Sequence, residues 1–113
     1  MLPSVTERTF KQEVLESPVP VLVSFWAPWC GLCRAIDPLL LRLPSETCEM
    51  IKVVGINADE NLKLATTYRL TSLPTLIFFE KGRVVHRLED FNGREDLRRA
   101  LEKIRVSFLA ASA

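Results

Sequence analysis

The chain has 113 residues, of which 48% are hydrophobic and 26% are charged. This length predicts one domain, and the high hydrophobic content excludes a disordered chain. Lys and Arg number 15 against 14 Asp and Glu, so the formal net charge is +1. We expect no nucleic-acid partner, because such proteins carry a broad positive field. No apolar run reaches the ~20 residues of a membrane-spanning helix, and no signal peptide is expected at the N-terminus.

The first half of the chain alternates between helical and strand patterns. We expect a helix over residues 7–15, then a strand over residues 21–26. The nearly continuous apolar run of that strand is typical of a central strand covered on both faces. A second helix is expected from residue 31 to about 47. Because proline lacks an N–H and collides with the preceding turn, Pro38 should kink this helix, and Pro44 should kink it again or end it early.

The second half of the chain ends in a predicted β-hairpin and a helix. Gly82 stands in the hairpin turn, where a positive φ favours glycine. The closing helix carries an apolar stripe at helical spacing, formed by Leu97, Leu101, Ile104 and Phe108. In chain order, the expected elements are a strand at 51–57, a short helix capped by Asn61 and ending near 68, strands at 75–79 and 84–88, and a helix at 94–109.

The order of these elements predicts the topology. Two apolar strands joined through a helix imply a right-handed parallel crossover, and the terminal hairpin adds antiparallel strands. We therefore expect a single α/β domain over residues 1–113, with a mixed central β-sheet flanked by helices on both faces.

Three cysteines are too few for a disulfide-stapled scaffold, which favours a reducing compartment. Cys30 and Cys33 form a Cys-x-x-Cys pair, while Cys48 stands alone. Haem attachment needs a His directly after such a pair, but Arg34 occupies that position. A zinc site needs four ligands. Only Cys48 and His86 could complete one with this pair, and nothing in the sequence places them near it. We therefore expect no metal. A redox dithiol is favoured, with two unrelated core cysteines as the remaining alternative.

The position of the pair suggests a role for each thiol. The pair, with Gly31 and Leu32 between its cysteines, follows an apolar strand and opens a helix. Cys30 should therefore lie at the helix N-terminus, where free N–H groups and the helix dipole stabilise a thiolate. Cys33 should lie one turn further on and be more buried. We expect Cys30 to attack a substrate disulfide and Cys33 to resolve the mixed disulfide.

Several separated segments resemble those of the thioredoxin family, and the resemblance extends from about residue 5 to residue 108. It implies the thioredoxin fold and a protein thiol–disulfide oxidoreductase that reduces target protein disulfides without a bound cofactor. The matching segments are the active-site sequence from Phe25 to Cys33, the helix-kinking Pro38, the cis-proline segment Leu73-Pro74-Thr75 and the hairpin turn Lys81-Gly82.

The resemblance also implies how substrates and partners bind. It makes Trp29, beside Cys30, an exposed apolar docking surface, and the alternative for this residue is packing in the core. Leu73 and Pro74, joined by a cis peptide bond, would pair with the substrate backbone. The implied partners are disulfide-containing proteins and a thioredoxin reductase, either flavin- or ferredoxin-dependent. The protein would be a monomer in the cytoplasm or, after removal of a targeting segment, inside an organelle, with no membrane partner.

The chain departs from the family pattern around the dithiol. Leu32 replaces a proline, which restores an N–H that could stabilise the thiolate and make the disulfide more oxidising. Ser24 stands where the family usually has a buried Asp below the resolving cysteine, and Gly55 stands where a Lys commonly neighbours that Asp. The family's carboxylate is thought to help deprotonate the resolving thiol, which a Ser hydroxyl cannot do near pH 7.

A further departure concerns substrate access. Asp90 and Phe91 fall where the family usually has Gly followed by a small residue beside the dithiol. Phe91 should narrow the substrate groove, and Asp90 should repel acidic substrates. These departures leave two alternatives to a disulfide reductase. One is an oxidase- or isomerase-leaning protein, favoured by Leu32. The other is a thioredoxin-like binding module with little turnover, favoured by the lost Asp and the narrowed groove.

Overall fold

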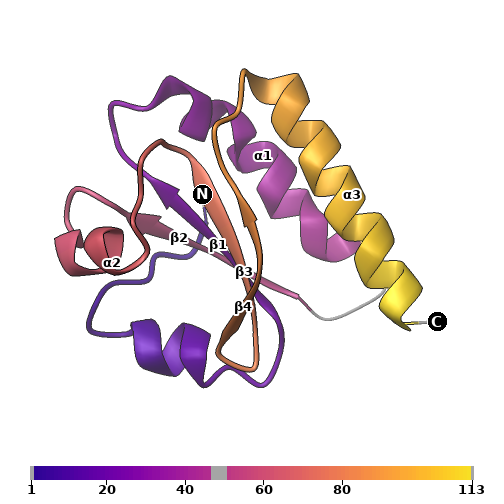
Figure 1. Cartoon of the computed structure of the whole chain (residues 1–113), viewed down its shortest axis with the longest axis horizontal. Helices are drawn as coiled ribbons and strands as arrows, with labels where there is room; N and C mark the ends of the chain where they lie inside the picture. The colour runs from indigo at the N-terminus through magenta and orange to yellow at the C-terminus, as the bar shows by residue number, and fades with distance from the viewer. Residues whose placement is uncertain (1, 47–50, 113) are drawn as a thin grey trace.

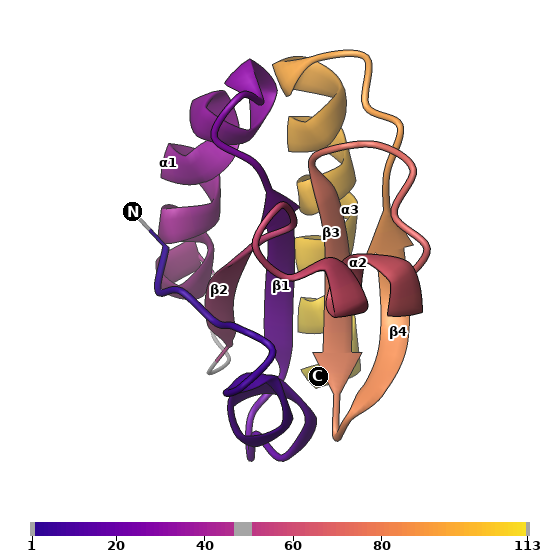
Figure 2. The same cartoon turned by 90° about the vertical axis from the view of Figure 1, so that its left-hand side faces the viewer.

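The computed structural model describes residues 2–46 and 51–112, and in them four strands form one sheet (Figure 1). The strand order is β2-β1-β3-β4, with β1 and β2 parallel and the other neighbouring pairs antiparallel (Figure 2). The predicted mixed sheet, with a parallel pair and a terminal hairpin, is confirmed. The strands are β1 (Val21–Trp26), β2 (Lys52–Asn57), β3 (Thr75–Glu80) and β4 (Arg83–Leu88).

Helices cover both faces of the sheet, as predicted. Two long helices, α1 and α3, lie side by side against one face, whereas a short π-helix, η1, and the short helix α2 lie on the other side (Figures 1 and 2). The helices are η1 (Lys11–Leu15), α1 (Gly31–Glu46), α2 (Leu62–Thr67) and α3 (Arg94–Ser112).

The residues of β1 explain why the core has two layers. Leu22 packs in the cluster on the α1 and α3 side, whereas Val23 and Phe25 pack in the cluster on the η1 and α2 side. Because successive side chains of a strand point to opposite faces, the apolar run of β1 contributes to both clusters. Ser24 follows Leu22 in this alternation, so it faces the α1 side, and it is only 1% exposed.

The first helix begins later than predicted. Residues 7–9 form a turn, and the π-helix starts at Lys11. The hydroxyl of Thr9 accepts a 3.1 Å hydrogen bond from the N–H of Thr6, and such local side-chain bonds compete with helical ones. Phe10 and Val14 are nevertheless both buried, as their spacing of four residues predicts.

Pro44 does not end the second helix early. It lies inside α1, which continues through Glu46. Proline removes only one intrahelical hydrogen bond, and the buried side chains of Leu40 and Leu43 on the same helix still anchor this end to the core. Of the two effects expected of Pro44, the early end of the helix is therefore wrong, and the kink stays a prediction.

The N-terminal segment adds a pairing that the sequence did not predict. Gly55 of β2 donates a 2.8 Å hydrogen bond to the carbonyl of Pro3 and accepts a 2.9 Å bond from the N–H of Val5. Ser4 thus forms a parallel bridge with Gly55, and Leu2 enters the core on the α1 side. This contact holds residues 2–5 against the open edge of β2.

The remaining elements follow the sequence prediction with one exception. The hairpin turn has positive φ angles at Lys81 and Gly82, 53° and 78°, as expected for a tight turn. Asn61 precedes α2 but does not cap it. Instead its side chain accepts a hydrogen bond from the N–H of Glu7 and donates one to the carbonyl of Asn57, both 2.9 Å long. A buried amide that joins two other segments is not available for capping.

The closing helix α3 packs beside α1 through the stripe that the sequence identified. Leu97 and Leu101 are both buried in the α1-side cluster. Ile104 and Phe108, the other members of that stripe, lie outside the residues whose side chains the structure describes.

Candidate active site

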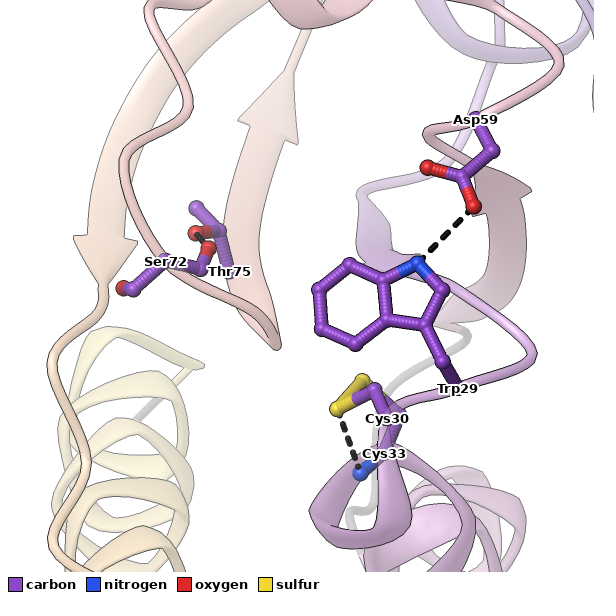
Figure 3. The surroundings of a disulfide bond; sticks show 6 residues. All are labelled: Trp29, Cys30, Cys33, Asp59, Ser72 and Thr75. Atoms are coloured by element: carbon purple, nitrogen blue, oxygen red, sulfur yellow. Dashed lines mark hydrogen bonds between the residues drawn. A yellow bond between two sulfur atoms is a disulfide. The ribbon is translucent and has the colours of Figure 1, made fainter.

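Cys30 and Cys33 form a disulfide with 5.3 Å between their Cα atoms (Figure 3). Cys30 directly precedes Gly31, the first residue of α1, and its Sγ accepts a 3.1 Å hydrogen bond from the N–H of Cys33. Cys30 is 6% exposed and Cys33 is 2% exposed. The two cysteines are therefore partners, which excludes the alternative of unrelated core thiols.

The start of α1 supplies the electrostatic environment of the pair. The first N–H groups of a helix have no intrahelical partner, and the aligned peptide dipoles place partial positive charge there. Gly31 is exposed and adds no side chain, while Leu32 is half-buried and packs against the α1-side core. A thiolate formed at this end of the helix is stabilised, and thiolates are the reactive species in disulfide exchange.

Trp29 lies on the surface beside the disulfide, with 68% of the residue exposed. Its indole Nε1–H donates a 2.9 Å hydrogen bond to Oδ2 of Asp59, as Figure 3 shows. Core packing of Trp29 is therefore excluded. Sequence analysis missed Asp59, although a signal existed. Asp59 follows the carboxyl end of β2, and the carboxyl ends of parallel strands meet at one edge of a sheet.

Leu73 and Pro74 are joined by a cis peptide bond, as the family resemblance implied. They directly precede β3, whose first residue Thr75 pairs with Phe25 near the end of β1. Thr75 also donates a 2.7 Å hydrogen bond from Oγ1 to the carbonyl of Ser72 (Figure 3). The antiparallel pairing of β1 with β3 thus brings the Leu73-Pro74 segment to the edge of the sheet where the dithiol lies.

Asp90 and Phe91 follow β4. Asp90 has a positive φ of 59°, and its Oδ1 accepts a 3.1 Å hydrogen bond from the hydroxyl of Ser72. The N–H of Asp90 donates a 3.3 Å bond back to the same hydroxyl. Asp90 is therefore held against the segment that precedes Pro74, through a serine that sequence analysis missed. Phe91 is half-buried and packs against the α1-side core.

No metal centre is evident in the part of the chain that the structure describes, where no group of three or more His, Cys, Asp or Glu side chains converges. His86 is exposed on β4, and its ring lies edge-on to Phe78 within the same hairpin. Cys48, the other ligand considered, lies outside the described residues. None of the described helices is long and apolar enough to cross a membrane.

The disulfide lies at the N-terminus of a helix and next to a cis-proline segment, on a mixed β-sheet covered by helices. This arrangement is typical of proteins that carry out thiol–disulfide exchange. The model of the thioredoxin family matches residues 2–103. The chain is 50% identical to thioredoxin 1 of Synechococcus elongatus over 82 residues, which cover 73% of this chain and 77% of that one. It is 46% identical to thioredoxin 1 of Nostoc over 99 residues, covering 88% and 92%.

The chain belongs to the thioredoxin family. It is a protein thiol–disulfide oxidoreductase that reduces protein disulfides through Cys30 and Cys33. A thioredoxin-like binding module with little turnover and an oxidase- or isomerase-leaning protein are not favoured. Disulfide-containing proteins and a reductase are its partners in general terms. One further relative is named for an organelle: the chloroplastic M-type thioredoxin of Chlamydomonas reinhardtii is 46% identical over 80 residues, covering 71% of this chain and 57% of that one.

Proposed function

We propose that Cys30 is the nucleophile and Cys33 the resolving thiol of this reductase. The Cys30 thiolate attacks one sulfur of a target disulfide, and the second target sulfur leaves as a thiolate and takes a proton. The Cys33 thiolate then attacks Sγ of Cys30, which closes the Cys30–Cys33 disulfide and releases the first target sulfur. The observation that supports this order is the place of Cys30 at the start of α1, with 6% of the residue exposed against 2% for Cys33.

The surface around the disulfide supports a site for an extended target segment. Exposed Trp29 would provide apolar contact, and the Leu73-Pro74 segment would pair with the target backbone. Asp90, which is exposed next to that segment, would add negative charge. Phe91 directly follows Asp90 and is only half-buried where it packs against the core, so its exposed part would form part of the wall of this site. Ser24 would lie below Cys33, buried on the α1 side of β1.

The proposal extends to the partners of the protein and to the compartment in which it acts. The protein would act as a monomer and without a bound cofactor, and it would take its two electrons from a flavin- or ferredoxin-dependent thioredoxin reductase. It would act in a reducing compartment, either the cytoplasm or, as the name of the Chlamydomonas relative suggests, the interior of an organelle.

Insulin reduction with dithiothreitol as the electron source tests the assigned roles. Cys30→Ser should abolish turnover. Cys33→Ser should trap a mixed disulfide at Cys30, which mass spectrometry of the intact protein and its peptides detects. Cys48→Ser is the matched control and should keep the parent rate. Alkylation of the reduced protein at neutral pH should label Cys30 first. Faster labelling of Cys33 would reverse the two roles.

A further inference from the structure

A cavity of about 350 Å³ lies next to the resolving cysteine. It joins the N-terminal segment, the end of β1, the loop that follows β1 and the first turns of α1. At roughly 30 Å³ per water molecule, the cavity has room for several waters. Its lining residues are Leu2, Ser4, Trp26, Pro28, Cys33, Arg34 and Asp37.

The chemistry of resolution requires a proton acceptor at this place. Cys33 is only 2% exposed, and burial disfavours ionisation of a thiol. To attack Cys30 it must lose its proton, yet bulk water has little direct access. Ser24 is buried on the α1 side of β1, and its hydroxyl does not act as a base near pH 7.

The described residues that line the cavity offer one suitable acceptor. Ser4 carries only a hydroxyl group, and the guanidinium group of Arg34 has hydrogen-bond donors but no acceptor. Asp37 supplies a carboxylate. Asp37 follows Cys33 by four residues on α1, a spacing that brings two Cβ atoms on one helix face to about 5–6 Å. One water molecule can bridge a thiol and a carboxylate over such a separation.

The electrostatic surroundings of Asp37 suit a base. Partial burial raises the pKa of the Asp37 carboxyl above its ordinary value. The positive charge of the chain's amino terminus lowers this pKa to a smaller extent. Arg34 is the other charged side chain on the cavity wall, and it is exposed, whereas the residues contributed by the N-terminal segment and β1 are uncharged. A base becomes more effective as its pKa approaches the working pH.

We propose that Asp37 accepts the proton of the Cys33 thiol through water in this cavity. The proton passes from Cys33 Sγ to water and from water to the Asp37 carboxylate. The Cys33 sulfur forms its bond to Cys30 Sγ while the bond between Cys30 Sγ and the target sulfur breaks. The target leaves with the electron pair of that bond as a thiolate, and Asp37 later returns its proton to solvent. Asp37 is thus a positioning residue that acts on Cys33 through water, and this role rests on the proposed order of the two cysteines.

Stopped-flow absorbance with an excess of an uncharged dipyridyl disulfide separates the two steps. Capture at Cys30 releases one thiopyridone, and resolution by Cys33 releases a second. All variants carry Cys48→Ser, which removes the third thiol. Asp37→Asn is compared with Asp37→Glu and with Glu80→Gln, a matched loss of one negative charge at an exposed position at the end of β3. Far-UV circular dichroism and urea unfolding check that each variant is folded.

Asp37→Asn should leave the first phase unchanged and slow the second phase at least about tenfold near pH 7. The difference should shrink steadily as the pH is raised, because a thiol then ionises without help from a carboxylate, even where burial disfavours its charged form. Asp37→Glu should restore most of the rate, and Glu80→Gln should match the parent.

A faster second phase in Asp37→Asn would indicate that the carboxylate is not a base. If Asp37 acted only as a nearby negative charge, Asp37→Asn would favour the Cys33 thiolate and would speed the second phase at pH 7. That outcome, an unchanged rate, or an equal loss at every pH would overturn the proposal. Failure of the proposed cysteine roles is distinguishable in the two single-thiol variants, because reversed roles would make Cys33 in Cys30→Ser react with the reagent faster than Cys30 in Cys33→Ser.

Discussion

Ser24 on β1 lies directly opposite Gly55 on β2 in the parallel strand pair, and neither residue carries a charge. Ser24 is 1% exposed, and the N-terminal segment covers Gly55 through its bonds to Pro3 and Val5. A Cβ atom at Gly55 would meet Nε1 of Trp26 at 3.2 Å. The Ser24–Gly55 pair is therefore uncharged and closed off, with no spare room beside Gly55.

This arrangement predicts a stability cost for Ser24→Asp. A buried charge without a partner costs about 3 kcal/mol, so the free energy of unfolding in urea at pH 7 should fall by about that amount. The loss should shrink at low pH, where the new carboxyl is protonated and only the cost of burying its larger polar group remains. Ser24→Ala is the control and should cost much less. A loss below about 0.5 kcal/mol in Ser24→Asp would mean that water reaches position 24 and that the site is not closed.

Leu32→Pro should make the dithiol less oxidising. The change removes the N–H of Leu32 from the first turn of α1, where free N–H groups are expected to stabilise a Cys30 thiolate. A hydrogen bond to a charged group contributes about 1.5 kcal/mol. For two electrons this corresponds to a potential about 30 mV more negative. Equilibration with glutathione measures the potential. Leu32→Ala keeps the N–H and removes most of the apolar side chain, so it should stay near the parent value. An equal shift in both variants would assign the effect to packing.

Asp59→Ala should weaken the action on protein targets. Without its 2.9 Å hydrogen bond to the carboxylate, the indole of Trp29 loses its orientation beside the dithiol. An exposed hydrogen bond to a charged group contributes about 1 kcal/mol. If that energy is lost from the transition state, kcat/KM for insulin should fall roughly fivefold. The indole N–H resonance of Trp29 should move in the same variant. Glu60→Gln, one residue further on, is the control. A shifted resonance with unchanged kcat/KM would show that Trp29 orientation does not affect catalysis.

Asp90→Asn should change which targets are preferred. Asn accepts the bond from Ser72 and tolerates the positive φ of this position, so the change removes only the charge. KM should fall about threefold for disulfide peptides with acidic flanks and rise for peptides with basic flanks, and both effects should weaken in high salt. Asp96→Asn, on the exposed first turn of α3, serves as the control. Equal changes for both peptide classes would argue for an altered loop rather than an electrostatic effect.

Asp37→Asn should alter the pH dependence of stability. Burial raises the pKa of the Asp37 carboxyl in the folded chain, so the native state binds this proton more tightly than the unfolded state. Ionisation of Asp37 therefore opposes folding, and its unfavourable contribution grows as the pH rises from the unfolded pKa through the folded pKa. Urea unfolding should show the variant equal to the parent at low pH and more stable at pH 7. A less stable variant at pH 7 would reveal a stabilising contact of the carboxylate.

Local patterns in the sequence were sufficient for most of the fold and for the dithiol. The apolar run of β1 predicted a central strand, and the placement of Cys30 and Cys33 after it predicted a redox pair at a helix start. Gly82 predicted the hairpin turn. These features depend on residues that are neighbours in the chain, so periodicity and turn chemistry report them directly. Family resemblance added the Leu73-Pro74 segment, which local chemistry alone would have treated as an ordinary strand start.

Only the tertiary structure decided how the polar residues around the dithiol are used. The bond between Trp29 and Asp59 and the bond between Ser72 and Asp90 join residues 30 and 18 positions apart. The cavity beside Cys33 needs Leu2 and Ser4, which reach it because the N-terminal segment pairs with β2. Asp and Ser residues in loops carry no local pattern that reveals such partners, and the signal for Asp59, its place after β2, depends on the topology of the sheet. Their roles depend on which edges of the sheet the crossover and the antiparallel pairing bring together, and the whole chain determines that arrangement.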